Sequence, residues 1–191
     1  MIPRAGARPV WPLILTLLAM VLTPAAVAAR QFKVEEVHTK LEDGTYLLDA
    51  RIDYRFSQEA LEALDNGVPL TIEVHMQVRR VDAWIWEDSV ADIQLRYAIR
   101  FRPLAEQYEV YRLPGDTGRS FISREAAIAA LGEIRGIQIV SKDRLEPDLA
   151  YLVYLKVELD IEELPLPLRP MAYLRPAWKL RSSWTEWPLT P

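Results

Sequence analysis

The stretch Ile72-Glu73-Val74-His75-Met76-Gln77-Val78-Arg79 decides the fold of this chain. Its apolar side chains occupy every second position, and polar side chains fill the positions between them. Successive side chains of a β-strand point to opposite faces, so the pattern predicts a strand with one buried and one solvated face. The same alternation runs through residues 48–56 and 93–102. It is typical of antiparallel sheets, because strands of parallel sheets are apolar on both faces.

Less regular segments predict further strands. Residues 32–41 change phase near Glu35 and Glu36, which indicates a β-bulge, and residues 42–44 predict a hairpin turn. Residues 108–112 and 151–161 also read as strands.

Two short helices interrupt the strands. Ser57 is placed to N-cap a helix that runs to Leu64, and Ser123 is placed to N-cap another that ends before Gly132. The whole pattern predicts a mainly β fold, a single antiparallel β-sandwich-like domain with two short helices. A barrel, or one sheet with helices on one face, is the alternative.

Residues 1–29 have the order of a secretory signal peptide. Arg4 and Arg8 precede an apolar run over residues 10–22, and small residues at 25–29 supply a cleavage site. We therefore expect export and a mature β-rich domain of residues 30–191. The alternative is an uncleaved anchor in the inner membrane, although a full span needs about 20 apolar residues and this run is shorter. Since the chain has no Cys, a lipid anchor on cysteine and disulfides are both excluded.

The charge of the chain argues against several partners. It holds 23 Lys and Arg against 27 Asp and Glu, a net charge of −4. Loss of Arg4 and Arg8 would leave 21 against 27, or −6. Nucleic acid requires a basic footprint, so no nucleic-acid partner is expected, and stable membrane insertion after cleavage is not expected either. The oligomeric state stays open.

Charged residues line the polar faces of the predicted strands. They are Asp49, Arg51, Asp53, Arg55, Arg96, Arg100 and Arg102. We interpret them as cross-strand ion pairs, each contributing about 0.2–1 kcal/mol. An arginine patch that binds anions is the competing interpretation.

The carboxy-terminal segment, residues 164–191, departs from the alternating pattern. Its prolines at 165, 167 and 170 predict that residues 164–170 run extended, near polyproline II. The residues that follow are rich in Trp and Arg. The segment either packs across the sandwich as an extended Pro/Trp-rich tail, or exposes rings that bind a partner. The candidate partner-binding residues are Arg169, Tyr173, Arg175, Trp178, Trp184 and Trp187. Trp84 and Trp86, two positions apart, are expected to be a packing pair at the end of a sheet.

The residues that carry most enzyme chemistries are missing. There is no Cys, no HExxH around His38 or His75, and no GxSxG, GxGxxG or P-loop motif. The acidic residues Glu158, Asp160, Glu162 and Glu163 lack the spacing of a calcium loop. We therefore expect no catalytic, cofactor-binding or metal-binding residues and no cofactor.

Several segments together resemble a known family. They include Phe32-Lys33-Val34, Ser123-Arg124-Glu125-Ala126-Ala127, Leu164-Pro165-Leu166-Pro167-Leu168-Arg169-Pro170 and the ending Ser182-Ser183-Trp184 to Trp187-Pro188-Leu189. With them the chain resembles the proteobacterial family of domain of unknown function 4390 over essentially all of its mature length. The resemblance implies a Gram-negative envelope, hence the periplasm, and an association with membrane sensor kinases. It implies no catalytic residues.

Three hypotheses for function follow. The first is a non-catalytic periplasmic domain that binds another envelope protein, such as the extracytoplasmic region of a sensor. The second is a binding module for a small or glycan ligand, which requires a concave pocket with an exposed ring. The third is a hydrolase that uses carboxylates alone, which requires two of them across a cleft.

Overall fold

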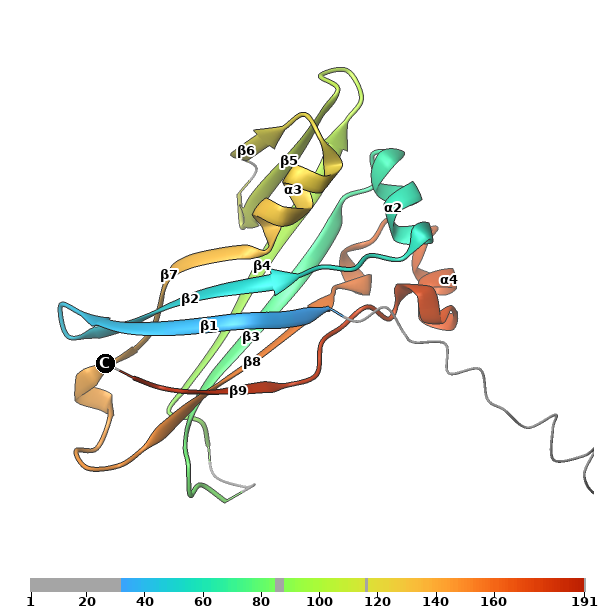
Figure 1. The fold of residues 1–191 in the computed structure, drawn as a ribbon. Helices are drawn as coiled ribbons and strands as arrows, with labels where there is room; N and C mark the ends of the chain where they lie inside the picture. Colours follow the sequence, from blue (N-terminus) through green and yellow to red (C-terminus); the bar gives the residue numbers. More distant parts are fainter. Residues whose placement is uncertain (1–31, 85–87, 116, 191) are drawn as a thin grey trace, which may run out of the picture.

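Two antiparallel sheets face each other in the computed structural model, which describes residues 32–84, 88–115 and 117–190 (Figure 1). One sheet has the strand order β1-β2-β7 and the other β6-β5-β4-β3-β8-β9. The predicted β-sandwich-like fold is confirmed. The expected signal peptide lies outside the described residues. In the part of the chain that is described, no helix combines the length and apolar character needed to cross a membrane.

The strands are β1 (Lys33–Glu42), β2 (Thr45–Asp53), β3 (Leu70–Arg80), β4 (Ala91–Arg102), β5 (Gln107–Leu113), β6 (Gly118–Phe121), β7 (Glu133–Ser141), β8 (Tyr151–Leu159) and β9 (Thr185–Pro188).

The hairpin β1–β2 has the two local features that the sequence predicts. The register of the pair shifts between Val34 and Glu36, which is the expected bulge. Asp43 and Gly44 form the two-residue turn with φ angles of 49° and 74°. Positive φ at both positions is the type I′ geometry that matches the twist of the flanking strands, and Gly adopts it without a steric penalty.

The core lies between the two sheets, where the apolar half of each alternating strand points inward. In the central strand β3 the inward side chains Ile72, Val74, Met76 and Val78 are buried. In β2 the buried set includes Leu48 and Ile52. Such burial of apolar area is the main favourable term in folding, at about 25 cal/mol per Å².

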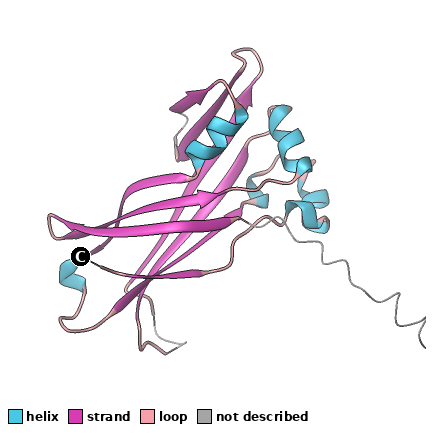
Figure 2. Ribbon diagram, in the orientation of Figure 1, coloured by secondary structure: helices cyan, strands magenta, loops and turns pink. Residues whose placement is uncertain are grey.

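Both predicted helices form where their caps are. In α2 (Gln58–Asp65) the Ser57 hydroxyl accepts a hydrogen bond from the backbone N–H of Ala60 at 3.2 Å. In α3 (Arg124–Leu131) the Ser123 hydroxyl accepts from Ala126 N–H at 3.1 Å. Both helices lie toward the end of the sandwich opposite the carboxy terminus, where they cover the ends of strands (Figure 2).

Strands β6, β7 and β9 are found only in the structure. The alternation of β7 is interrupted at Gly136, which has a φ of 64°, and the register between β2 and β7 shifts twice. Strand β9 is only four residues long and contains Pro188. That proline is tolerated because β9 is an edge strand, paired on one side only.

The prediction for residues 164–170 is wrong in its conformation. Instead of running extended, the chain turns at residues 166–168 and enters α4 (Arg169–Leu174). Pro170 fits there because N–H groups in the first turn of a helix have no partner within the helix, so losing one costs nothing. The 3₁₀ helices η2 (Ile161–Glu163) and η3 (Pro176–Trp178) flank α4.

The end of the tail is extended and fixed to both sheets. β9 pairs with β8 in the larger sheet. Beyond it, the backbone N–H of Thr190 donates to the Thr39 hydroxyl in β1 at 3.0 Å, and that hydroxyl lies 2.8 Å from the Thr190 carbonyl oxygen. The tail therefore joins the edge strands of the two sheets.

Candidate functional site

The structure divides the six predicted tail residues into a buried and an exposed group. Trp178 is 2% exposed and belongs to the hydrophobic core. Trp187 lies opposite Val153 in β8 and is half-buried against the core. Arg169 is also half-buried, and its Nε donates to the Leu164 carbonyl oxygen at 2.6 Å. For these three residues, the structure supports a role in packing.

The exposed group consists of Tyr173, Arg175 and Trp184. Tyr173 lies on α4, and its hydroxyl donates to Glu162 at 3.3 Å. The pKa of Tyr173 is raised, first by desolvation and then by the nearby Glu162 carboxylate. Arg175 follows directly after α4.

Tyr173 is part of a larger apolar surface that the sequence did not single out. Leu166, Met171, Tyr173 and Leu174 are 37% to 82% exposed, and we call them the α4 surface. These four are among the ten exposed large hydrophobic side chains of the described residues, yet they fall within nine positions. Contiguous exposed apolar patches mark interaction sites, whereas single exposed residues need no explanation, so the clustering of these four within one short segment makes it a candidate site. α4 lies at the end of the sandwich where β1 begins (Figure 1).

Basic side chains accompany the α4 surface. Arg175, Lys179 and Arg181 are exposed, and no carboxylate of the described residues lies within 4.0 Å of their charged nitrogens. Arg181 faces Glu158 across a backbone bridge, but Glu158 pairs with Lys156 at 2.7 Å. One feature of the sequence could have revealed these three cations: no Asp or Glu occurs between residues 164 and 185.

Trp184 stands on the outer face of the six-stranded sheet. Its ring meets that of His75 at a centroid distance of 5.0 Å and an angle of 61°. His75 Nε2 lies 2.8 Å from Asp92 Oδ1, and Gln77 donates to Asp92 Oδ2 at 2.8 Å. The side chains of His75, Gln77 and Asp92 are therefore hydrogen-bonded to one another, while Trp184 remains 42% exposed.

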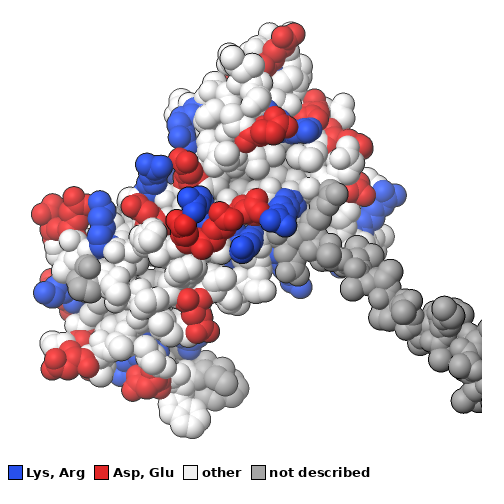
Figure 3. All heavy atoms as spheres, in the orientation of Figure 1, with Lys and Arg blue, Asp and Glu red and all other residues white. Residues whose placement is uncertain are grey.

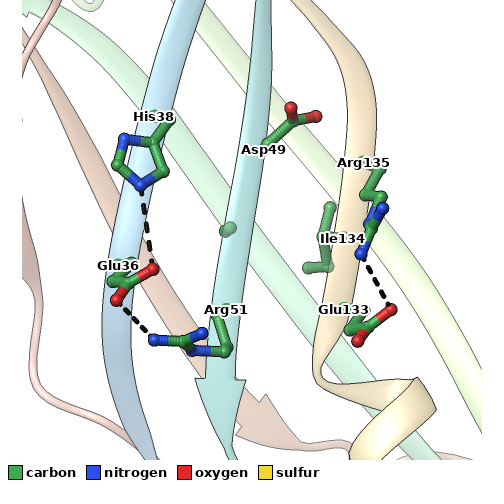
Figure 4. A pocket seen from close by; sticks show the side chains of 8 residues that line it. Glu36, His38, Asp49, Arg51, Glu133, Ile134 and Arg135 are labelled. Carbon is green, nitrogen blue, oxygen red and sulfur yellow. Dashed lines mark hydrogen bonds and ion pairs between the residues drawn. The ribbon is translucent and has the colours of Figure 1, made fainter.

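The face of the three-stranded sheet carries a shallow polar hollow of about 240 Å³ (Figure 4). It is lined by Glu36, His38, Asp49, Ala50, Arg51, Glu133, Ile134 and Arg135. Arg51 binds both Glu35 and Glu36, and Arg135 lies 3.3 Å from Glu133. Asp49 accepts a hydrogen bond from the backbone of Gly136 at 2.6 Å. Each arginine and each carboxylate of the hollow already has a partner, and Figure 3 shows the two signs of charge interleaved on this side of the molecule.

Three other arginines on the polar faces of the predicted strands are also paired with carboxylates. Arg100 and Arg102 both lie within 2.9 Å of Glu109, and Arg96 lies 2.6 Å from Glu163. Arg51 and Arg96 lie in different sheets, so they form no common row. These contacts favour the ion-pair interpretation over an anion-binding patch.

A larger hollow of about 820 Å³ lies at the opposite end from α4, between the β7–β8 connection and the end of β9. Its rings, Tyr46 and Tyr151, are buried. A third hollow of about 230 Å³ includes the half-buried Tyr97 and Tyr111. None of these three hollows is lined by Trp184 or Tyr173, so they lack the exposed ring that the glycan hypothesis requires.

Two further predictions concern Trp84 and the acidic residues. Trp84 is exposed, contrary to the expected packing pair, and Trp86 lies outside the described residues. Within the described ranges, no group of three His, Asp or Glu side chains could hold a metal ion.

Comparison with known proteins gives one match. No curated protein and no solved structure matches the chain. The model of one family, described as Domain of unknown function (DUF4390), matches residues 29–188, which is most of the sequence and includes α4 and the Trp-rich ending. The chain therefore belongs to the DUF4390 family, as its resemblance to that family predicted.

Proposed function

We propose that this protein is a non-catalytic interaction domain of the periplasm and that it binds another envelope protein through the α4 surface. The observation that carries the proposal is the cluster of Leu166, Met171, Tyr173 and Leu174, which are exposed on six-residue α4 and the turn before it. Burying such side chains against a partner contributes about 25 cal/mol per Å². Tyr, Met and Arg are also enriched at the centres of protein interfaces.

Export is supported by the signal-peptide pattern of residues 1–29, with Arg4 and Arg8 before an apolar run. The absence of a catalytic role is supported by the hollow on the three-stranded sheet, where each arginine and each carboxylate already has a partner. The extracytoplasmic region of a membrane sensor is the class of partner that the family resemblance suggests.

Site-specific photocrosslinking in intact cells tests the proposal. A photoreactive amino acid replaces Leu174 in one variant and Leu104 in a control variant. Leu104 is also fully exposed but lies in the turn between β4 and β5. We expect a discrete adduct with one envelope protein from position 174 and none from position 104. Absence of an adduct at 174, or the same adducts from both positions, would count against the proposal.

A further inference from the structure

We infer that the partner of the α4 surface is an acidic amphipathic protein segment, one that presents carboxylates beside apolar side chains. This inference rests on the proposed function and adds the chemistry of the partner.

The chain segment that contains α4 is basic, whereas the chain as a whole is acidic, and one carboxylate, that of Glu162, lies beside the segment at the Tyr173 hydroxyl. Residues 164–185 contain Arg169, Arg175, Lys179 and Arg181 and no acidic residue, in a chain with a net charge of −4. A local positive field on a negative protein steers negatively charged partners to this place.

Several arginines of the described residues are paired with carboxylates, although Arg112 and Arg144 are not. Arg55 lies 2.7 Å from Asp53, and Arg124 lies 2.5 Å from Asp65. By contrast, Arg175, Lys179 and Arg181 have no carboxylate within 4.0 Å among the described residues. A carboxylate from a partner can therefore bind them without displacing an existing ion pair.

Apolar side chains lie next to these cations in the chain. Leu174 immediately precedes Arg175, and Met171 and Tyr173 lie one turn or less before it on α4. A partner that satisfies both features must carry Leu-like and Glu-like side chains close together. An amphipathic acidic helix has this arrangement, with its apolar stripe bordered by carboxylates.

An anionic bilayer would also attract exposed cations and apolar groups, but it fits less well. Glu162, which accepts a hydrogen bond from Tyr173, lies beside the α4 surface, so a flat negative surface laid against it would meet this carboxylate as well. A peptide can direct its carboxylates to Arg175, Lys179 and Arg181 and away from Glu162. The α4 helix has six residues, whereas helices that bind in the plane of a membrane are commonly 20 to 30 residues long.

The test uses the mature protein and a defined probe. The probe is a fluorescent amphipathic peptide of Leu and Glu, and its counterpart has every Glu replaced by Lys. Binding is measured by fluorescence anisotropy at low and at high salt. We expect the acidic probe to bind at least about tenfold tighter than the basic one, with the preference falling as salt screens the charges.

Two triple variants locate the effect. R175E/K179E/R181E changes the cations near α4, and R112E/K142E/R144E makes the same change of net charge at exposed positions elsewhere. The first should abolish the preference for the acidic probe and the second should leave most of it. Circular dichroism verifies that both variants are folded.

Several results would overturn the inference. They are equal binding of the two probes, equal loss in both variants, or tighter binding to vesicles containing phosphatidylglycerol than to the acidic probe. If crosslinks form at position 174 in cells but the protein binds both probes equally, the proposed function is retained and the inference of an acidic partner is rejected.

Discussion

Replacing Trp178 by alanine distinguishes the structural role of this residue from the binding role that its sequence context suggested. A Trp side chain buries roughly 150–250 Å², which corresponds to about 4–6 kcal/mol at 25 cal/mol per Å². Alanine retains part of that burial, and truncations of buried aromatic residues cost about 3–5 kcal/mol. The indole N–H of Trp178 is buried and has no hydrogen-bond partner among the described residues, so no hydrogen bond is lost. We therefore expect a loss of about 3–4 kcal/mol.

Urea unfolding of the mature protein, followed by circular dichroism, measures this loss. Trp184→Ala is the matched control, because Trp184 lies six positions away in the same tail but is 42% exposed. That variant should lose less than about 1 kcal/mol, as exposed positions do. In thermal melts, the loss for Trp178→Ala corresponds to a fall of about 10 °C for a domain of this size. Equal losses in the two variants, or a loss below about 1 kcal/mol for Trp178→Ala, would refute the assignment of this ring to the core.

Three further predictions concern stability. Ser57→Ala and Ser123→Ala should each cost about 1 kcal/mol in urea unfolding, because each removes the side-chain cap of a helix; no loss would mean that the hydroxyl bonds are not formed in solution. Gly132→Ala should cost about 1–3 kcal/mol in the same assay, since its Cβ would lie 2.2 Å from the Ile52 carbonyl oxygen, and an unchanged midpoint would contradict this close approach. Burial raises the pKa of Tyr54 far above its ordinary value, and its hydroxyl has no hydrogen-bond partner among the described residues. The phenol stays neutral in the folded chain, so its contribution to the free energy of unfolding is fully present below about pH 10, which is its pKa in the unfolded chain. That contribution is lost as the pH rises further. Unfolding free energy measured against pH should fall more steeply above about pH 10 in the natural protein than in Tyr54→Phe, and identical slopes would argue against burial of the hydroxyl.

Much of the sandwich could be predicted from local sequence because each signal lies within a few residues. The alternation in β3 follows from strand geometry, and the Asp43-Gly44 turn follows from the φ angles that glycine allows. Ser57 and Ser123 mark helix starts because the cap bond spans only three residues.

Predictions failed where a segment depends on distant partners. β7 has a broken pattern at Gly136, and only its pairing with β2 makes it a strand. β9 is too short to be recognised alone, and it exists because the edge of β8 is available to it. For residues 164–170 the prolines exclude the middle of a helix but not its first turn, and the sequence did not reveal that α4 begins there.

The sequence by itself determined that this is a mainly β protein, where most of its strands and helix caps lie, and which family it belongs to. Only the tertiary structure decided which aromatic residues of the tail are available to a partner. Trp178 and Trp184 look alike in sequence, yet one is in the core and the other on the outer face of a sheet. The physical reason is that burial depends on what the rest of the chain places against a side chain. The same holds for the α4 surface, because exposure of Leu174 beside unpaired cations arises only when the turn, the helix and the sandwich are assembled.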